Sequence, residues 1–328
     1  MDGKVKFAFA LSAAALAAVC LASLCFGSAD LGVGKILKCL FAPDGSIDST
    51  IVWSLRMPRI AAAIIVGASL ALAGCGLQCI FRNPLAEPSI TGISAGASLG
   101  AVISIMFMPA FLPLEVLAFI CAMLASSAVC ALGSEGGKVN PQMTILAGVA
   151  VNALCGAMVG LFMYATRESG LKSFVFWSMG SFDKCDWRDV AVCACISIPA
   201  WAVIASQYKN LNAMLLGDRQ AFDVGVNVRR THILVVVAAV AMTAAGVAMC
   251  GTIGFVGLMI PHIARTICGA GNGRVMPMSI ILGAGLAVAS DLGARAIAPE
   301  NPIPIGVITA ILGAPFFAAI LRKSKRNA

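Results

Sequence analysis

Charged side chains are scarce in this chain: Asp, Glu, Lys and Arg make up 12% of its 328 residues, whereas 60% are hydrophobic. The mean hydropathy is +0.94. A soluble domain of this composition could not cover its surface with polar groups, so that class is excluded. The composition predicts an all-α polytopic membrane protein, because helices satisfy their own backbone groups in lipid. At about 20 apolar residues per crossing, residues 1–328 leave room for roughly ten spans in a single transmembrane domain.

Histidine is nearly absent, and no two of the thirteen cysteines have the CxxC spacing. With only His232 and His262 present, an ordinary haem or zinc site is not expected, and no metal or cofactor is assigned to the chain. The net charge of +8 does not indicate nucleic acid, since the basic residues are scattered among apolar segments and form no stripe with aromatic partners. Positive-inside topology accounts for these charges better.

A nucleotide-binding loop is also absent. The three Gly-Lys pairs, which begin at Gly3, Gly34 and Gly137, are each followed by Val or Ile and not by the Ser or Thr of a P-loop. An ion-coupled carrier would hold carboxylates at mid-membrane, whereas the acidic residues fall at span ends or in loops, with Asp291 the nearest to an exception. Energy is therefore expected from a partner subunit. A secondary, ion-coupled transporter of a small solute is the alternative, and a membrane-embedded enzyme comes third because no cluster of catalytic polar residues is visible.

Ten apolar segments predict spans near residues 7–27, 58–80, 90–107, 114–132, 143–165, 189–206, 231–250, 252–268, 275–297 and 304–321. The apolar run from Ile233 to Ile260 is too long for one span, so we divide it at Cys250-Gly251-Thr252. Residues 7–26 could instead be a signal peptide, but their length of about 20 residues favours a retained helix. An even number of spans places both termini on one side. Most of the basic residues fall on that side, which is therefore expected to be the cytoplasm.

Four segments resemble one known family. They are Trp53–Gly100, Gly251–Arg265, Asp291–Arg295 and Pro304–Phe317, which together with the spans between them cover most of the chain. They are similar to the FecCD-type permeases, which import iron-siderophores, haem and cobalamin as part of type II ABC importers. The resemblance implies a homodimer in the cytoplasmic membrane that works with two ATP-binding subunits, which bind ATP and Mg²⁺, and with an extracytoplasmic substrate-binding protein. It also implies that the cargo is an iron-siderophore, ahead of cobalamin and haem. In relatives the transport pathway is lined chiefly by the fifth and tenth spans.

The segment from residue 207 to 230 is too long for a simple turn and mixes apolar with charged residues in a helix-like pattern. In the family this loop couples the permease to the ATPase. The resemblance assigns that role to Leu215, Leu216, Gly217, Asp218, Ala221 and Gly225. The alternative is an amphipathic segment on the bilayer surface, with Leu211, Met214 and Leu215 in lipid.

Arg56, Arg59 and Arg295 lie near the predicted outer ends of spans. They match family positions that receive a glutamate from each lobe of the substrate-binding protein, and a guanidinium suits a carboxylate because it is always charged and binds bidentately. Alternatively, these arginines anchor helix ends at lipid headgroups, or pair with Asp291 four residues before Arg295.

Two loops at predicted inner ends of spans carry prolines. Asn83, Leu85, Pro141 and Gln142 match the cytoplasmic gates of the family. Proline at these places also ends a helix where its backbone can meet water, and this simpler role applies whether or not the loops form a gate.

Small residues recur at four-residue spacing in Gly92, Gly96 and Gly100, and again in Gly156 and Gly160. Such rows allow helices to approach closely in lipid, and packing within one subunit is favoured here over a dimer contact or a lining of the transport pathway. Pro261-His262 is interpreted as a helix kink with a hydrogen-bonded imidazole. Cys39 and Cys185, both in predicted outside loops, are expected to be free thiols.

Overall fold

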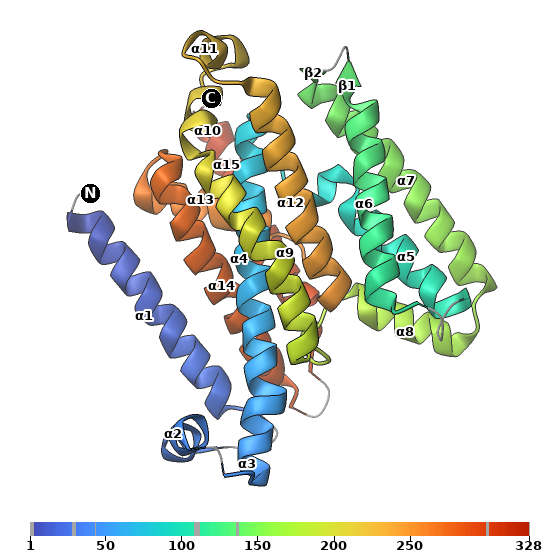
Figure 1. The fold of residues 1–328 in the computed structure, drawn as a ribbon, viewed down its shortest axis with the longest axis vertical. Coiled ribbons are helices and arrows are strands. Elements are labelled where there is room, and N and C mark those ends of the chain that lie inside the picture. Colours follow the sequence, from blue (N-terminus) through green and yellow to red (C-terminus); the bar gives the residue numbers. More distant parts are fainter. Residues whose placement is uncertain are drawn as a thin grey trace.

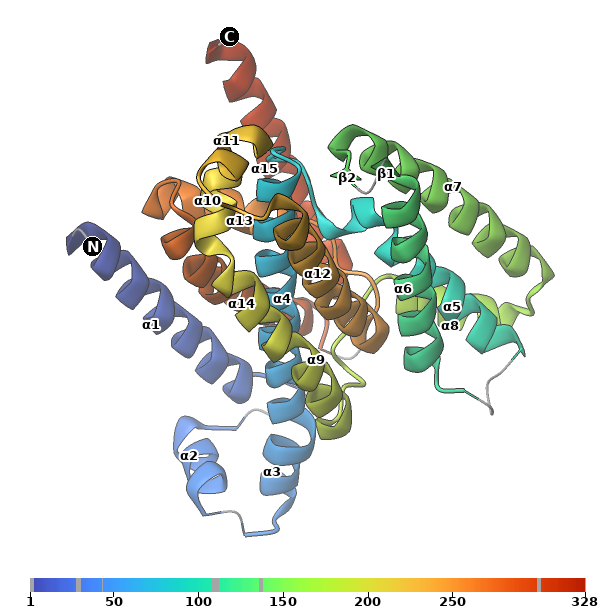
Figure 2. The same ribbon diagram turned by 45° about the horizontal axis from the view of Figure 1, so that its top comes forward.

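The computed structural model describes residues 3–27, 31–42, 44–107, 112–135, 138–299 and 302–327, and they are predominantly helical (Figures 1 and 2). Ten longer helices in this part of the chain occupy the positions of the ten predicted spans. They are α1 (Gly3–Cys25), α4 (Met57–Ile80), α5 (Ile93–Phe107), α6 (Leu114–Leu132), α7 (Pro141–Ala165), α9 (Trp187–Ser206), α12 (Val228–Cys250), α13 (Val256–Cys268), α14 (Asn272–Ile297) and α15 (Ile305–Asn327). The all-α polytopic class is confirmed.

Seven apolar helices of the described residues are long enough to cross a membrane, and three further apolar helices, within α5, α13 and α15, are shorter. The longest of the seven runs without interruption from Ile47 to Ile80, because the short helix α3 (Ile47–Thr50) and the π-helical turn η1 (Ile51–Arg56) lead directly into α4. The predicted span 58–80 is therefore the C-terminal part of a longer helix.

Short elements connect the spans. They are α2 (Val33–Phe41), the 3₁₀ turn η2 (Pro88–Thr91), α8 (Glu168–Ser178), α10 (Tyr208–Met214), α11 (Asp218–Asp223) and the two-residue antiparallel strands β1 (Ser134–Glu135) and β2 (Lys138–Val139). Helix α8 was not expected from the sequence, which placed residues 166–188 in a loop. The helix-like pattern between residues 207 and 230 is present as α10 and α11.

The break between α12 and α13 confirms the division of the long apolar run. Helix α12 ends at Cys250, and Gly251 follows with φ of +76° and ψ of −170°, a conformation that glycine adopts without the strain a Cβ would cause and that is incompatible with continuing the helix. The break is longer than expected, since α13 begins only at Val256. Two hydrogen bonds join the break to the end of α8 and the loop that follows it: the Ser181 N–H donates to the Cys250 carbonyl at 2.8 Å, and the Thr252 hydroxyl donates to the Ser178 carbonyl at 2.5 Å. Non-helical backbone within a membrane-spanning bundle is tolerated where it contacts protein or lines a cavity, and Thr252, Gly254 and Phe255 line two cavities.

Helix α4 is the centre of the bundle and packs against α9, α12, α13 and α14. In the continuous helix from Ile47 to Ile80, 83% of the apolar membrane-spanning stretch is buried inside the bundle. Small residues allow this closeness: a Cβ placed on Gly67 would lie 2.3 Å from the Gly283 carbonyl oxygen of α14, and one on Gly74 would lie 1.9 Å from the Gly257 carbonyl oxygen of α13. The helix backbones therefore touch directly, as expected for association in lipid.

The remaining helices form two edges of the bundle. Helix α1 packs on α14 at one edge, and the group α5–α8 lies at the other edge, where α6 packs on α12 (Figures 1 and 2). The chain termini lie toward the end of the bundle that carries α10 and α11, here called the α11 end. Helices α2 and α3 lie at the opposite end, called the α2 end (Figure 1).

The two glycine rows have different surroundings. Gly96 and Gly100 of α5 face α6, where an added Cβ would meet the carbonyl oxygens of Cys121 at 2.5 Å and Leu117 at 2.4 Å, so internal packing is confirmed for this row. Gly156 and Gly160 of α7 have no described atom within 4 Å of such a Cβ. Internal packing does not explain the second row in the described part of the chain.

Replacing Gly283 tests the central contact. Gly283→Val would force α14 away from the backbone of α4, and we expect a loss of about 1–3 kcal/mol from overpacking, seen as a lower midpoint of thermal unfolding in detergent. Gly285→Val is the matched control, because it lies on the same helix and has no described atom within 4 Å of an added Cβ. Equal midpoints for the two variants would contradict the contact.

Candidate functional sites at the two ends of the bundle

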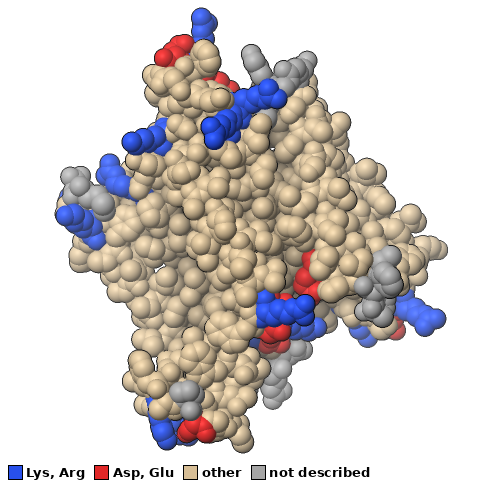
Figure 3. Space-filling view, viewed as in Figure 1, with Lys and Arg blue, Asp and Glu red and all other residues tan. Residues whose placement is uncertain are grey.

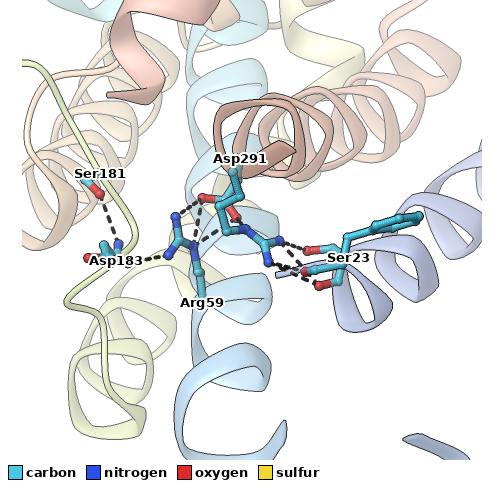
Figure 4. A network of polar contacts seen from close by, with 7 residues as sticks. Ser23, Arg59, Ser181, Asp183 and Asp291 are labelled. Carbon is cyan, nitrogen blue, oxygen red and sulfur yellow. Dashed lines mark hydrogen bonds and ion pairs between the residues drawn. The ribbon is translucent and has the colours of Figure 1, made fainter. Parts of the chain in front are cut away.

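Four charged side chains form one network at the α2 end of the bundle (Figure 4). The Arg59 Nε donates to both carboxylate oxygens of Asp291, at 2.9 and 3.0 Å, and its Nη1 is paired with Asp183. The Arg295 Nε also donates to Asp291, at 3.1 Å. One buried carboxylate thus binds two arginines that come from α4 and α14.

The network extends to the end of α1. The Arg295 guanidinium donates to the Ser23 hydroxyl at 2.5 Å and to the Phe26 carbonyl at 2.8 Å. Arg56 donates to the carbonyls of Leu24 and Cys25. The last turn of α1 is therefore held to α4 and α14 by arginine donors that satisfy its free carbonyl groups.

Burial distinguishes the members of this network. Arg56, Arg59 and Arg295 are 6%, 9% and 8% exposed, and Asp291 is 1% exposed. The Asp183 side chain, in contrast, is 58% exposed. Asp183 lies on the loop after α8, where its backbone N–H donates to the Ser181 hydroxyl at 3.1 Å. Arg59, Arg295 and Asp291 alone would carry one uncompensated positive charge, so Asp183 supplies the balancing carboxylate from the solvent side.

The three arginines that were predicted to bind a partner protein thus lie together. Arg59 and Arg295 also pair with Asp291, which the sequence suggested as an alternative role for these arginines. Sequence reasoning gave no role in this network to Asp183 and did not consider Ser23. No local signal could have found these two residues, because Asp183 is 124 positions from Arg59 and Ser23 is 272 positions from Arg295.

The segment between residues 207 and 230 lies at the α11 end. Leu211 and Met214 of α10 are 0% and 1% exposed and pack into the core, so the alternative that placed them in lipid is wrong. Between the two short helices, Leu216 is 77% exposed and Gly217 has φ of +127°, which allows a sharp turn. Of the other predicted coupling residues, Ala221 is fully buried, Leu215 is 39% exposed and Gly225 again has a positive φ, of +86°.

An ion pair joins this segment to the end of α4. Arg82 Nη2 lies 3.4 Å from Asp218 Oδ2, and both side chains are 39% exposed. Arg82 directly precedes Asn83, whose side-chain oxygen accepts the Leu85 N–H at 2.9 Å and stabilises the turn after α4. The predicted coupling segment and the first predicted gate loop are therefore in contact.

The second predicted gate loop begins α7. Asn140 caps this helix by accepting the N–H groups of Gln142 and Met143 at 3.1 and 3.3 Å, and Pro141 occupies the first helical position. Helix initiation therefore explains Asn140 and Pro141. Among the residues that the structure describes, no hydrogen bond or ion pair joins this loop to Asn83 or Leu85.

Cys39 and Cys185 are free thiols, as expected, and both are buried in the same apolar cluster at the α2 end. Burial and the nearby Asp189 raise the pKa of Cys185 to about 12, so its thiol is protonated at neutral pH. Pro261 lies inside α13, and the His262 ring contacts Phe316 edge-on at 5.9 Å. In the described ranges no group of three His, Cys, Asp or Glu side chains is placed to hold a metal ion.

We expect the two aspartates of the arginine network to differ strongly in their effect on stability. Asp291→Asn would leave two buried guanidinium groups without their shared carboxylate and should cost about 3–5 kcal/mol. Asp183→Asn should cost no more than about 1 kcal/mol, because its side chain is mostly exposed. Thermal unfolding of the two variants in detergent measures the difference, and a similar loss for both would show that Asp291 is not the centre of the network.

Comparison with known proteins gives a consistent result. The model of the FecCD transport family matches residues 15–323. The cobalamin import permease BtuC of Halobacterium salinarum is 39% identical over 83% of this chain and 73% of its own length. The hemin transport permease HmuU of Yersinia pestis is 36% identical over 84% of both chains. A solved structure described as an inward-facing conformation of a metal-chelate type ABC transporter is 31% identical, with a TM-score of 0.86 over 97% of this chain and 99% of the other.

Proposed function

The chain belongs to the FecCD transport family, and on this premise we propose that it is the membrane-spanning permease of a metal-chelate importer driven by separate ATP-binding subunits. The observation that carries the proposal is the fold match to a metal-chelate type ABC transporter over 97% of the chain. The family consists of transport permeases and not of enzymes, and membership does not favour the alternative of an ion-coupled carrier. The missing P-loop supports ATP and Mg²⁺ binding by a partner.

An iron-siderophore is the proposed cargo, with cobalamin and haem as the other candidates. The named relatives are permeases for cobalamin and for hemin, so the support extends to metal chelates with large organic ligands. Uptake by proteoliposomes that contain this chain, the ATPase and the binding protein encoded with it would test the function. Lack of ATP-dependent uptake of all three classes would contradict it.

The proposed assembly is a homodimer with the pathway between the two copies, lined by α7 and α15. Support comes from the apolar residues that these helices leave exposed, including Leu154 and Leu161 of α7 and Ile311 of α15, which are 63%, 66% and 64% exposed. The open space beside Gly156 and Gly160 lies on the same helix. A cavity of about 760 Å³ between α15, the break before α13 and the end of α8 also opens beside α15.

Coupling to the ATPase is assigned to the turn between α10 and α11, with Leu215, Leu216, Gly217 and Asp218 as contact residues and Ala221 and Gly225 as its support. Exposed apolar side chains favour this role, since Leu216 and Phe222 are 77% and 72% exposed. The preceding helix α10 is held in the core by the buried residues Leu211 and Met214. Asn83 and Leu85, next to the Arg82–Asp218 pair, and Pro141 and Gln142 are proposed to form the gate at the same end.

A charge at the tip of the turn tests coupling. Leu216→Glu should leave the permease folded, because the side chain is 77% exposed, yet it should abolish uptake and lower transport-stimulated ATP hydrolysis at least about tenfold by breaking an apolar contact. Leu216→Met is the control that keeps an apolar side chain. If uptake and stimulated hydrolysis both survive in Leu216→Glu, the turn does not transmit the ATPase motion.

Docking of the substrate-binding protein is assigned to the α2 end, which is then external, with both termini cytoplasmic. The arginine network supports this, since Arg56, Arg59 and Arg295 form a basic centre. Of the two described carboxylates bonded to Arg59, Asp183 is mostly exposed and Asp291 is buried. A partner's glutamate would replace Asp183 on Arg59. The gathering of basic side chains near the α11 end fits a cytoplasmic location for that end (Figure 3).

Removing the competing carboxylate tests this arrangement. Asp183→Asn should strengthen docking of the binding protein about two- to tenfold, and the gain should shrink as salt is raised. Asp48→Asn, at an exposed carboxylate paired with Lys35 at the same end, is the control. Binding should occur to right-side-out vesicles and not to inverted ones; the opposite sidedness, or weaker docking in Asp183→Asn, would refute the assignment.

A further inference from the structure

A groove runs between α6 and α9 on the side of the bundle. Both helices pack against α12, but in the described part of the chain they make little contact with each other (Figure 1). The space between them is a cavity of about 320 Å³. This is the volume of about ten water molecules. It suits one extended chain better than a helix, which is about 10 Å across.

The inside of this α6/α9 groove is apolar. Its floor is formed by Ala245, Ala248 and Met249 of α12, and the small side chains of the two alanines leave the space open. The walls come from Val116 and Phe119 of α6 and from Val192 and Ile196 of α9. Exposed apolar residues continue along both helices, as in Leu124 and Ile198, which are 64% and 55% exposed. The groove therefore opens onto a surface that faces lipid.

Charged residues form the rim of the groove at one end. Glu115 lies in the first turn of α6, and Asp186, Arg188 and Asp189 lie at the start of α9. Figure 3 shows acidic and basic side chains gathered here on a face that is otherwise largely uncharged. Asp186 and Asp189 cap α9 reciprocally, with N–H to carboxylate distances of 2.8 and 3.3 Å, which fixes the position of the rim.

We propose that the α6/α9 groove binds a phospholipid whose headgroup carries a primary ammonium, such as phosphatidylethanolamine. One acyl chain lies between α6 and α9, the ammonium binds the rim carboxylates, and the phosphate binds Arg188. The acyl chain contributes little selectivity, because bulk lipid is as apolar as the groove. Selectivity comes from the rim, where three carboxylates and one guanidinium disfavour an anionic headgroup, and the three N–H donors of the ammonium match the carboxylate oxygens.

The position of the groove gives the lipid a structural role. Helix α6 belongs to the group α5–α8, whereas α9 and α12 pack with the central α4. A bound chain would fill the seam between these two parts of the bundle and add contacts to both. The lipid therefore acts as a ligand of the folded permease, and its binding does not depend on the transport activity proposed above.

Native mass spectrometry of the purified permease tests the site. The protein is titrated in detergent with phosphatidylethanolamine, phosphatidylcholine or phosphatidylglycerol. We expect about tenfold tighter binding of phosphatidylethanolamine than of phosphatidylglycerol, with phosphatidylcholine, which lacks the N–H donors, in between. Glu115→Gln should reduce this preference to about threefold, whereas Glu168→Gln, at an exposed carboxylate of α8 outside the groove, should leave it unchanged.

A second pair of variants tests the location. Val192→Trp would fill the groove from α9 and should abolish retention of phosphatidylethanolamine, whereas Val237→Trp, equally exposed on α12 but outside the groove, should not. The two residues are 57% and 55% exposed, so neither change disturbs the core. Equal binding of the three lipids, unchanged retention in Val192→Trp, or a copurifying peptide in place of lipid would overturn the proposal.

Discussion

Direct backbone contact between α4 and its neighbours is the constraint on which the rest of this structure depends. Within lipid there is no hydrophobic driving force to hold two apolar helices together, so association requires close packing. Gly67 meets Gly283 of α14, and Gly74 meets Gly257 of α13, at distances that no side chain could occupy. These two contacts bring α4 directly against α13 and α14, and with α9 and α12 these helices enclose it.

Helix α4 links the two ends of the bundle. At one end it contributes Arg59 to the buried network around Asp291. Toward the other end, Gln78 donates to the Gly257 carbonyl at 3.2 Å and accepts from Arg265 at 2.5 Å. Arg82, which follows the helix, pairs with Asp218 of α11. One continuous helix therefore joins the arginine network at the α2 end to the Arg82–Asp218 pair at the α11 end.

Several polar groups of the bundle are paired at places where two helices, or a helix and a loop, meet. The broken segment between α12 and α13 is hydrogen-bonded to the end of α8 and the loop after it, and the end of α1 is hydrogen-bonded to Arg56 and Arg295. In each case a group that lipid cannot satisfy finds its partner within the protein. Three features that remain open at the surface are functional candidates: the half-exposed Asp183, the apolar tip at Leu216 and the charged rim of the α6/α9 groove.

The amino-acid sequence alone determined the number and approximate positions of the spans, the break at Gly251, the helical nature of residues 207–230 and the family. These features depend on apolar length, on backbone preferences and on motifs, all of which are local. Only the tertiary structure decided that Arg59 and Arg295 share Asp291, that Asp183 pairs with Arg59, that Leu211 and Met214 are buried, and that Gly156 and Gly160 face away from the subunit. Such facts follow from which helix faces meet, and apolar segments of similar composition carry almost no local signal that specifies their neighbours, since lipid and protein interiors are equally apolar.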